Sequence, residues 1–309
     1  MNLQPSALQN EIAAAAREWL AKQLPLARVR ELAAGAGALP DEATWAAYAE
    51  SGWFGLGLDQ QHGGLGLGAA EEAVLFRELG RALAPGPVLA TVLAAHTMQA
   101  AGPAELTAAL VGGRRRAALT TQGRVLDGGP GDLVLAVDES GVTVSQLHDC
   151  SPAEPVDPLT RVAHLGGADV LLRVDDPSVL TRAHVLATAQ LLGIVEAVCD
   201  ISVAYARTRT QFGKPIGSFQ AVKHRTADMA VTAYAVTGQL FHAAAAYLVA
   251  ARGATRAATD TIQNLGGIGF TWEHDAHLYL KRAHVLANCF GPLRGTHARI
   301  MAPERHEFA

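Results

Sequence analysis

The sequence predicts a mainly α-helical protein with a small β domain between two helical ones. Three observations lead to this fold class. Half of the 309 residues are hydrophobic, only 17% are charged, and alanine dominates many apolar stretches, which favours packed helices over disorder. The apolar pattern is helical as far as about residue 112 and alternates from about 116 to 173. From residue 180 onward it returns to long helices.

These changes of pattern divide the chain into three blocks. A single hydrophobic core stops growing near ~250–300 residues, so this chain has room for more than one domain. We expect an N-terminal helical domain at residues 1–115, a reduced β domain at 116–176 and a C-terminal helical bundle at 177–309. The sequence contains no internal repeat and no low-complexity linker.

The first block reads as helices joined by glycine turns. Residues 3–24 form an amphipathic pattern, and a second helix is expected between the Pro-Asp pair at 40–41 and Gly52. The run 55–68 carries so many glycines that it predicts a loop of special backbone geometry. Residues 69–85 follow as another helix.

The middle block reads as strands. Residues 132–147 alternate apolar and polar side chains on both sides of a turn at 139–141, which is typical of a β-hairpin. Residues 168–176 predict a further strand.

The third block begins with a helix of about 26 residues at 183–208, roughly 39 Å long at 1.5 Å per residue. The chain then turns through Gly213, Pro215 and Gly217 before a helix that we expect to run without a break over 221–248. Arginines precede this turn and a helix N-terminus follows it, which suits a phosphate or pyrophosphate. The alternative is a basic helix end in solvent, which the helix dipole favours.

Longer motifs point to a known family. The stretches "RTRTQFGKPIGSFQAVKHRTADMA" at 207–230 and "IQNLGGIGFTWEHDAHLYLKRA" at 262–283 resemble the C-terminal domain of the acyl-CoA dehydrogenase family. "SGWFGLGLDQQHGGLGLG" at 51–68 and "FRELGRALAPGPVLA" at 76–90 resemble its first helical domain, so the resemblance covers most of the chain. It implies an acyl-CoA dehydrogenase fold and an FAD-dependent enzyme that desaturates acyl-CoA thioesters.

The resemblance also implies a set of cofactor-binding residues. In the family the arginine before the Phe-Gly pair and the Gln-x-x-Gly-Gly segment hold the ADP half of an FAD that belongs to the neighbouring subunit. Carried over by motif, Arg209 pairs with the pyrophosphate. The full expected set is Arg209, Gln211, Phe212, Gly213, Gln220, Gln263, Gly266 and Gly267.

The sequence departs from the family at the catalytic base. The family's glutamate, which takes the α-proton, is expected where Phe290 stands, and its other location falls near residues 182–183, where there is no acid. We therefore expect no catalytic residue in this chain. Glu196, Asp200 and Asp228 on the bundle helices read as structural or exposed carboxylates.

The β domain also lacks the segments with which the family grips the flavin ring. The region 117–137 keeps Thr120 and Thr121 but neither the Thr-Glu-Pro to Gly-Ser-Asp stretch nor the Trp-x-Thr stretch. The retained elements thus serve a neighbour's FAD, and the missing ones would serve a flavin of this chain. That pattern predicts a complementary subunit paired with a longer acyl-CoA dehydrogenase chain in an α2β2 heteromer, like those that degrade steroid and bile-acid side chains.

The expected partners are the longer subunit, an acyl-CoA substrate and an electron-transferring flavoprotein. Two alternatives stay open: a non-catalytic scaffold or acyl-CoA-binding protein, and a homodimer with a relocated acid. The net charge of −4 argues against nucleic acid as a partner. Three isolated cysteines, no secretory start and no uninterrupted apolar run of eighteen residues predict a cytoplasmic protein without a membrane span.

Other polar and aromatic residues near the second motif have plainer interpretations. His274, Asp275 and His277 lack a fixed zinc spacing, so no metal site is expected. Trp272 and Tyr279 are expected to be packing residues. The segment 157–161, "DPLTR", resembles the short members of the heteromers but predicts no chemistry.

Overall fold

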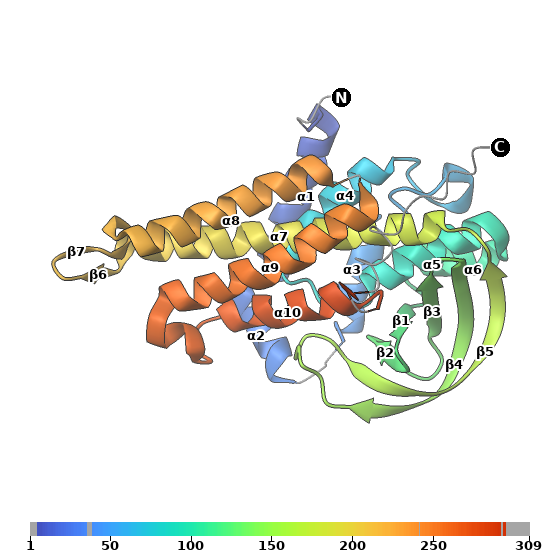
Figure 1. The fold of residues 1–309 in the computed structure, drawn as a ribbon. Coiled ribbons are helices and arrows are strands. Elements are labelled where there is room, and N and C mark those ends of the chain that lie inside the picture. The colour runs from blue at the N-terminus through green and yellow to red at the C-terminus, as the bar shows by residue number, and fades with distance from the viewer. Residues whose placement is uncertain (1–4, 36–38, 241, 292, 295–309) are drawn as a thin grey trace, which may run out of the picture.

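The structure is a computed structural model that describes residues 5–35, 39–240, 242–291 and 293–294 (Figure 1). The fold class is confirmed as mainly α with a small β domain. The N-terminal helices are α1 (Ala7–Gln23), α2 (Leu26–Ala34), α3 (Glu42–Glu50), α4 (Ala69–Arg81), α5 (Val88–Ala101) and α6 (Ala104–Val111), with a 3-10 turn η1 (Gln60–His62). The barrel strands are β1 (Ala117–Thr121), β2 (Arg124–Leu126), β3 (Leu133–Asp138), β4 (Gly141–Ala153) and β5 (Val162–Val174). The C-terminal part contains α7 (Ser178–Thr208), β6 (Thr210–Gln211), β7 (Lys214–Pro215), η2 (Ile216–Ser218), α8 (Gln220–Gln239), α9 (Ala243–Leu265), η3 (Gly266–Phe270) and α10 (Ala276–Asn288).

Local signals explain the N-terminal helices. The Asp41 carboxylate accepts a 2.7 Å hydrogen bond from the backbone N–H of Thr44, so it caps α3 where the sequence predicted a helix start. The glycine loop before α4 is also confirmed. A Cβ on Gly64 would lie 2.1 Å from the carbonyl oxygen of Leu58, so this close approach of two backbone segments requires glycine.

The five longer strands close into a barrel in the order β1-β2-β5-β4-β3. β3 and β4 form the predicted hairpin, with Asp138 opposite Gly141, and β1 pairs with β3 in parallel. The domain boundaries at residues 115 and 176 stay predictions.

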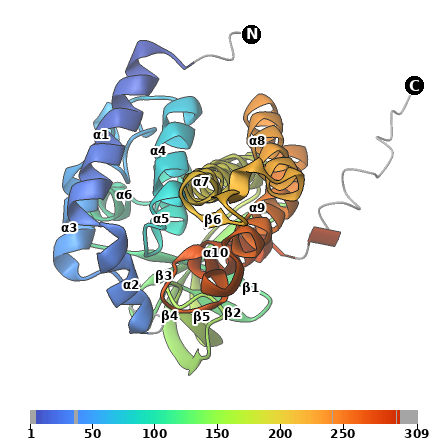
Figure 2. The same cartoon turned by 90° about the vertical axis from the view of Figure 1, so that its left-hand side faces the viewer.

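Helix α7 is the centre of the molecule. Figure 2 shows it between α4 and α5 on one side and α8, α9 and α10 on the other. By length and composition α7 could cross a membrane, but 78% of its most apolar window is buried inside the protein. Its apolar sequence therefore matches its place in the core.

The single helix expected over 221–248 is wrong. α8 ends at Gln239 and α9 begins at Ala243, whose φ of +40° cannot belong to a continuous α-helix. After this break the chain turns back along α7 (Figure 1). The reversal buries the alanine-rich face of α9, including Ala250 and Ala254, against the central helix, which a straight continuation of α8 could not do.

One buried ion pair joins the three parts of the chain. Arg282 of α10 donates through Nε to the Asp157 carboxylate at 2.5 Å, and the two residues are 7% and 0% exposed. The same guanidinium donates to the carbonyl oxygens of Ala84, after α4, and Leu159, after β4. The "DPLTR" segment is thus a structural anchor, which no pattern in the sequence predicted.

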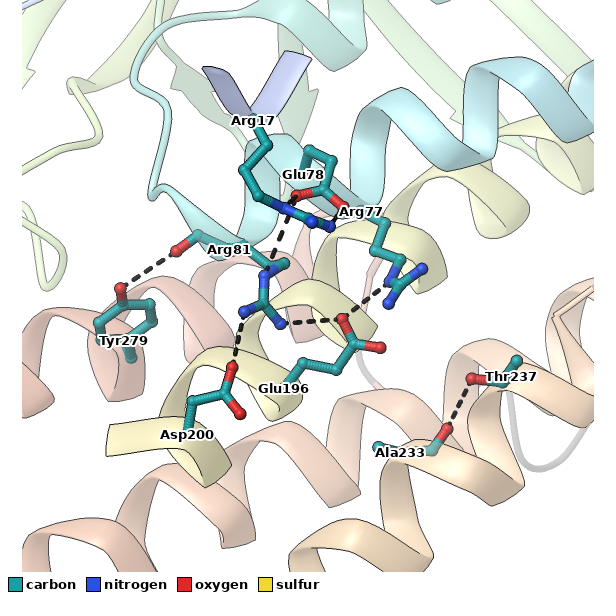
Figure 3. Close-up of polar contacts among 9 residues, drawn as sticks. All are labelled: Arg17, Arg77, Glu78, Arg81, Glu196, Asp200, Ala233, Thr237 and Tyr279. Atoms are coloured by element: carbon teal, nitrogen blue, oxygen red, sulfur yellow. Dashed lines mark hydrogen bonds and ion pairs between the residues drawn. The ribbon is translucent and has the colours of Figure 1, made fainter. Parts of the chain in front are cut away.

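A second network links the first helices to the bundle (Figure 3). Arg81 of α4 donates to Glu196 at 3.1 Å and to Asp200 at 2.6 Å, both on α7. Arg77 also donates to Glu196, and the hydroxyl of Tyr279 donates to the Arg81 carbonyl. The expectation that Glu196 and Asp200 are structural carboxylates is confirmed, as is the packing role of Tyr279.

We predict that Asp157→Ala destabilises the protein by about 3–5 kcal/mol, because it leaves the Arg282 charge buried without a counter-ion. Urea unfolding measures the change. Asp228→Ala is the matched control. That carboxylate is exposed, and its ion pair with the exposed Arg256 is long, at 3.9 Å, so its loss should cost little stability. A double variant, Asp157→Leu with Arg282→Met, should lose less stability than Asp157→Ala alone. A loss below about 1 kcal/mol in the single variant would contradict the assigned role.

Candidate functional site

The first cofactor segment is a tight hairpin at the end of α7. β6 and β7 pair through Thr210 and Pro215, and the turn residues Phe212 and Gly213 have φ of +52° and +76°. Two consecutive positive φ values are typical of the two-residue turns that match the twist of a β-hairpin. The backbone N–H of Ile216 donates to the Arg209 carbonyl at 2.8 Å, so Arg209 is fixed at the base of this hairpin.

The hairpin projects away from the core. Arg209 is exposed, and no carboxylate among the described residues lies within ion-pairing distance of it. Phe212 is 90% exposed, and Lys214 lies 4.7 Å over the ring of Phe219. An exposed aromatic and an arginine without a described anionic partner suit a ligand that carries both a flat ring and phosphates.

The second cofactor segment begins where α9 ends. Gly266 has φ of +67°, and a Cβ built on Gly266 or Gly267 would meet no atom within 4 Å, so this backbone has an open face. Gln263 is exposed. The buried Asn264 beside it donates to the Ser202 hydroxyl at 2.8 Å, which ties this last turn of α9 to α7.

The structure brings the two segments to one end of the bundle, away from the β barrel (Figure 1). Gln220, the first residue of α8, is exposed at the same end. Arg225 of α8 also donates to Asn264 at 3.3 Å, so α7, α8 and α9 hold the segments in one frame. The roles of the eight cofactor residues stay predictions, but this arrangement fits a pyrophosphate presented from outside the chain.

The position of the expected base holds an aromatic cluster. The Phe290 ring lies 5.8 Å from His184 and 6.0 Å from Tyr247, and His184 stacks on Tyr247 at 4.7 Å. The Tyr247 hydroxyl donates to the carbonyl oxygen of Leu286 at 2.6 Å. His184 follows directly on residues 182–183, so both family locations of the glutamate meet in this cluster. Neither supplies a carboxylate.

Arg182 is occupied elsewhere. Its guanidinium donates to the buried Glu72 of α4, whose other carboxylate oxygen lies 2.6 Å from Nε2 of His96. Burial alone would raise the pKa of Glu72, but its contacts with His96 and Arg182 hold that pKa below the ordinary value. This cluster joins α4, α5 and α7.

Carboxylates that sequence reasoning missed lie near Phe290. A hollow of about 300 Å³ is bounded by Phe290, Leu180 and the β3–β4 turn, which contributes Asp138 and Glu139. The Ser140 hydroxyl and N–H both donate to Asp138, which lowers the pKa of that carboxyl. A turn in the barrel and a residue after α10 are brought together only by the tertiary fold, so the sequence carried no signal for this pairing.

The cleft between the barrel and α10 is nearly filled. A cavity of about 50 Å³ remains there. Its lining includes Leu119, Leu126, Asp127, Thr160, Gln190, Arg282 and Cys289. At ~10–15 Å³ for each water, this is room for about four waters, and a three-ring isoalloxazine is far larger. Leu119, Leu126 and Asp127 come from the region where the family grips its flavin ring. This cavity therefore does not fit the ring, although the bundle end fits the ADP half. The hollow of about 300 Å³ beside Phe290 is a separate space.

Around α10, the described residues contain no group of three or more metal-ligating side chains in position for a metal ion. Asp275 instead pairs with Arg30 of α2 at 2.8 Å. Trp272 is 69% exposed, so its predicted packing role is wrong. At the surface, Lys281 lies 4.4 Å over its ring and the His277 ring lies 4.5 Å from it, so these two neighbours on α10 are its ring contacts.

Comparisons with known proteins agree with this geometry. Residues 6–112 match the model of the acyl-CoA dehydrogenase N-terminal domain, and residues 178–300 match that of the C-terminal domain. Acyl-CoA dehydrogenase IpdE2 of Mycobacterium tuberculosis is 38% identical over 257 residues, which cover 79% of this chain and 81% of the relative.

Two solved structures share the fold. The ChsE4-ChsE5 complex from Mycobacterium tuberculosis has a TM-score of 0.80 at 23% identity and covers 97% of this chain and 98% of the matched chain. The Tcur3481-Tcur3483 steroid acyl-CoA dehydrogenase G363A variant has a TM-score of 0.79 at 24% identity, with coverage of 94% and 96%.

We predict that Asp127 makes stability depend on pH. Burial, followed by a smaller contribution from the charge of Asp157, raises the pKa of Asp127 to about 7. An unfolded aspartate has a pKa of about 3.9, so the folded state binds this proton more tightly and stability falls as the pH rises from about 4 through 7. Asp127→Asn removes this contribution.

The measurement is urea unfolding of both proteins at about pH 5 and about pH 8, on either side of the folded pKa. The natural protein should lose more stability than Asp127→Asn between these values. The other titrating groups are common to both proteins and cancel in the comparison. Equal losses in the two proteins would show that Asp127 does not titrate in this range.

Proposed function

Because the chain belongs to the acyl-CoA dehydrogenase family, we propose that it is a complementary subunit of an FAD-dependent acyl-CoA dehydrogenase. In this role it lends the ADP-binding end of its bundle to an FAD whose ring is held by a longer partner chain. Bound FAD supplies the hydride acceptor for α,β-desaturation of an acyl-CoA thioester.

One observation carries the proposal. The two segments suited to the ADP half lie at the exposed bundle end, whereas the cavity lined by Leu119, Leu126 and Asp127, from the region where the family grips the ring, has a volume of about 50 Å³. If one FAD contacted both the bundle-end segments and this cavity on the same chain, its ring would have to fit into about 50 Å³. The segments are therefore of use only to a flavin whose ring lies in another chain.

The residues of this chain have distinct tasks in that arrangement. The Arg209 guanidinium neutralises the pyrophosphate, and the open backbone at Gly266 and Gly267 lets the nucleotide approach closely. The cluster around Phe290 offers no carboxylate for the α-proton, so the base comes from the partner. The reduced cofactor then passes its electrons to an electron-transferring flavoprotein.

Similar proteins support a heteromer. Two structures with this fold, ChsE4-ChsE5 and Tcur3481-Tcur3483, are named as pairs of chains, and the second is a steroid acyl-CoA dehydrogenase. We extend this to the present chain as an α2β2 assembly, with a steroid-like acyl-CoA as its substrate class.

A second candidate is a self-sufficient enzyme that uses a relocated acid. The observation that favours it is the hollow beside Phe290, which Glu139 also lines, and in this candidate Glu139 would serve as the base. A homodimer active without a partner, and inactivated by Glu139→Gln, would establish this candidate. The non-catalytic scaffold is the third outcome, in which neither chain nor complex binds FAD.

We predict that the purified chain is colourless and forms a yellow complex only with a longer family member expressed from the same genome. In that complex Arg209→Ala should lower FAD affinity about 10- to 150-fold, the equivalent of ~1.5–3 kcal/mol for one charged hydrogen bond. Flavin absorbance after gel filtration measures the retained FAD.

Arg256→Ala is the matched control, because Arg256 is a 75% exposed arginine of α9 that lies outside the two cofactor segments. It should leave the FAD content unchanged. Yellow protein without a partner, bleached by an acyl-CoA, would overturn the complementary role. Equal FAD loss in both variants would assign the effect to general surface charge.

A further inference from the structure

The cavity of about 50 Å³ between the barrel and α10 has polar side chains on several sides. Asp127 follows β2, Thr160 lies between β4 and β5, and Gln190 belongs to α7. Each of these side chains carries oxygen atoms. A cavity with an entirely apolar lining stays empty, whereas convergent polar groups hold water or an ion. The lining therefore indicates that this cavity has an occupant.

Gln190 gives the first indication of what that occupant is. The residue is 8% exposed, and its Oε1 atom has no hydrogen-bond partner among the described residues. Buried acceptors nearly always receive a hydrogen bond, because an unpaired acceptor loses its contact with water and gains nothing in return. The occupant must therefore donate a hydrogen bond or carry a positive charge.

Thr160 adds a second acceptor. It is 2% exposed, and its hydroxyl donates to the Asp157 carboxylate at 2.9 Å. A hydroxyl has one hydrogen and two lone pairs, so this oxygen has only lone pairs left for the cavity. Thr160 thus requires the same kind of occupant as Gln190 does.

Asp127 adds negative charge. The backbone N–H of Arg161 donates to its Oδ1 at 2.8 Å, which fixes the carboxyl group. Within the part of the chain that the structure describes, no basic side chain forms an ion pair with it. Arg282 also lines the cavity, but it pairs with Asp157 at 2.5 Å, and these two charges cancel. An ionised Asp127 is therefore left without a counter-ion.

We propose that the cavity binds one monovalent cation of about the size of potassium, held by side-chain oxygens of Asp127, Thr160 and Gln190. Carboxylate, hydroxyl and amide oxygens suit hard cations. One unmatched carboxylate balances a single positive charge. A divalent ion would bring excess positive charge next to Arg282, where the two would repel each other.

The size of the cavity fits the same class of ion. It has room for about four waters, and a potassium ion is about as large as one of them, so waters can complete its shell. Ammonium has the same charge and a similar size. The site differs from a transition-metal centre, since the described residues hold no suitable group of three or more His, Cys, Asp or Glu side chains.

The ion binds only the folded chain, because its three ligands lie in separate segments that the fold brings together. It thereby joins two loops of the barrel to α7. A ligand that binds the folded state alone raises the free energy of unfolding as its concentration rises. Binding requires neither FAD nor the longer subunit, so it is independent of the proposed function and can be tested on this chain alone.

The test is thermal unfolding of the purified chain at about pH 8, where the Asp127 carboxyl is ionised. Potassium chloride is exchanged for choline chloride at constant ionic strength, because choline is too large for the cavity. We expect Tm to rise by about 2 °C for each tenfold increase of potassium above its dissociation constant. Ammonium chloride should give a similar rise.

Two variants locate the ion. Asp127→Asn removes the charge and Gln190→Leu removes the amide oxygen, so each should lose the potassium-dependent rise in Tm. Thr107→Val is the matched control. Thr107 of α6 also has a buried hydroxyl without a partner among the described residues, but it does not line this cavity. That variant should keep the rise. Circular dichroism shows whether each variant is folded.

Two results would overturn the proposal. One is the same Tm in potassium, ammonium and choline chloride, which would mean that the cavity holds water only. The other is a potassium-dependent rise that persists in Asp127→Asn, which would place the ion elsewhere on the chain. Asp127→Asn keeps the size of the side chain, so it decides the question even if Gln190→Leu does not fold.

Discussion

The buried pair of Asp157 and Arg282 is the interaction on which the arrangement of the molecule depends. A charge taken out of water is tolerated only with a partner and further hydrogen bonds, and Arg282 finds both in segments from three parts of the chain. The barrel, the end of α4 and α10 are thereby fixed against each other. Asp127 and Arg282 both line the small cavity, where burial raises the pKa of the Asp127 carboxyl although the positive charge of Arg282 lowers it.

The same packing determines which part of a cofactor each region of the chain can bind. Where the barrel and α10 meet at the pair, the cavity between them measures about 50 Å³, far less than a flavin ring requires. The bundle end is under no such constraint, and its hairpin and glycine segment stay open. The open bundle end, the small cavity and the aromatic cluster are the observations on which the proposed division of labour between subunits rests.

Several of these features could be predicted from the sequence because their physical causes are local. The cap at Asp41, the glycine loop and the hairpin at 139–141 are local, so a short stretch contains the cause of each. The cofactor segments are long motifs, and their placement at one end follows from helix length and direction. The break between α8 and α9 escaped prediction because both flanks are alanine-rich, and only packing on α7 distinguishes one helix from two. The pairing of Asp157 with Arg282, and the position of Glu139 beside Phe290, join residues far apart in sequence, so no local pattern encodes them.

The contact between Arg30 and Asp275 has a consequence for synthesis. These residues are 245 positions apart, so the second helix of the chain finds its counter-charge only after nearly all of the protein has been made. Domains fold first at the N-terminus as the ribosome proceeds, at about 5–20 residues per second. Roughly 12 to 50 seconds therefore separate the two residues. During that interval Arg30 faces water, the ribosome and chaperones rather than the carboxylate of Asp275.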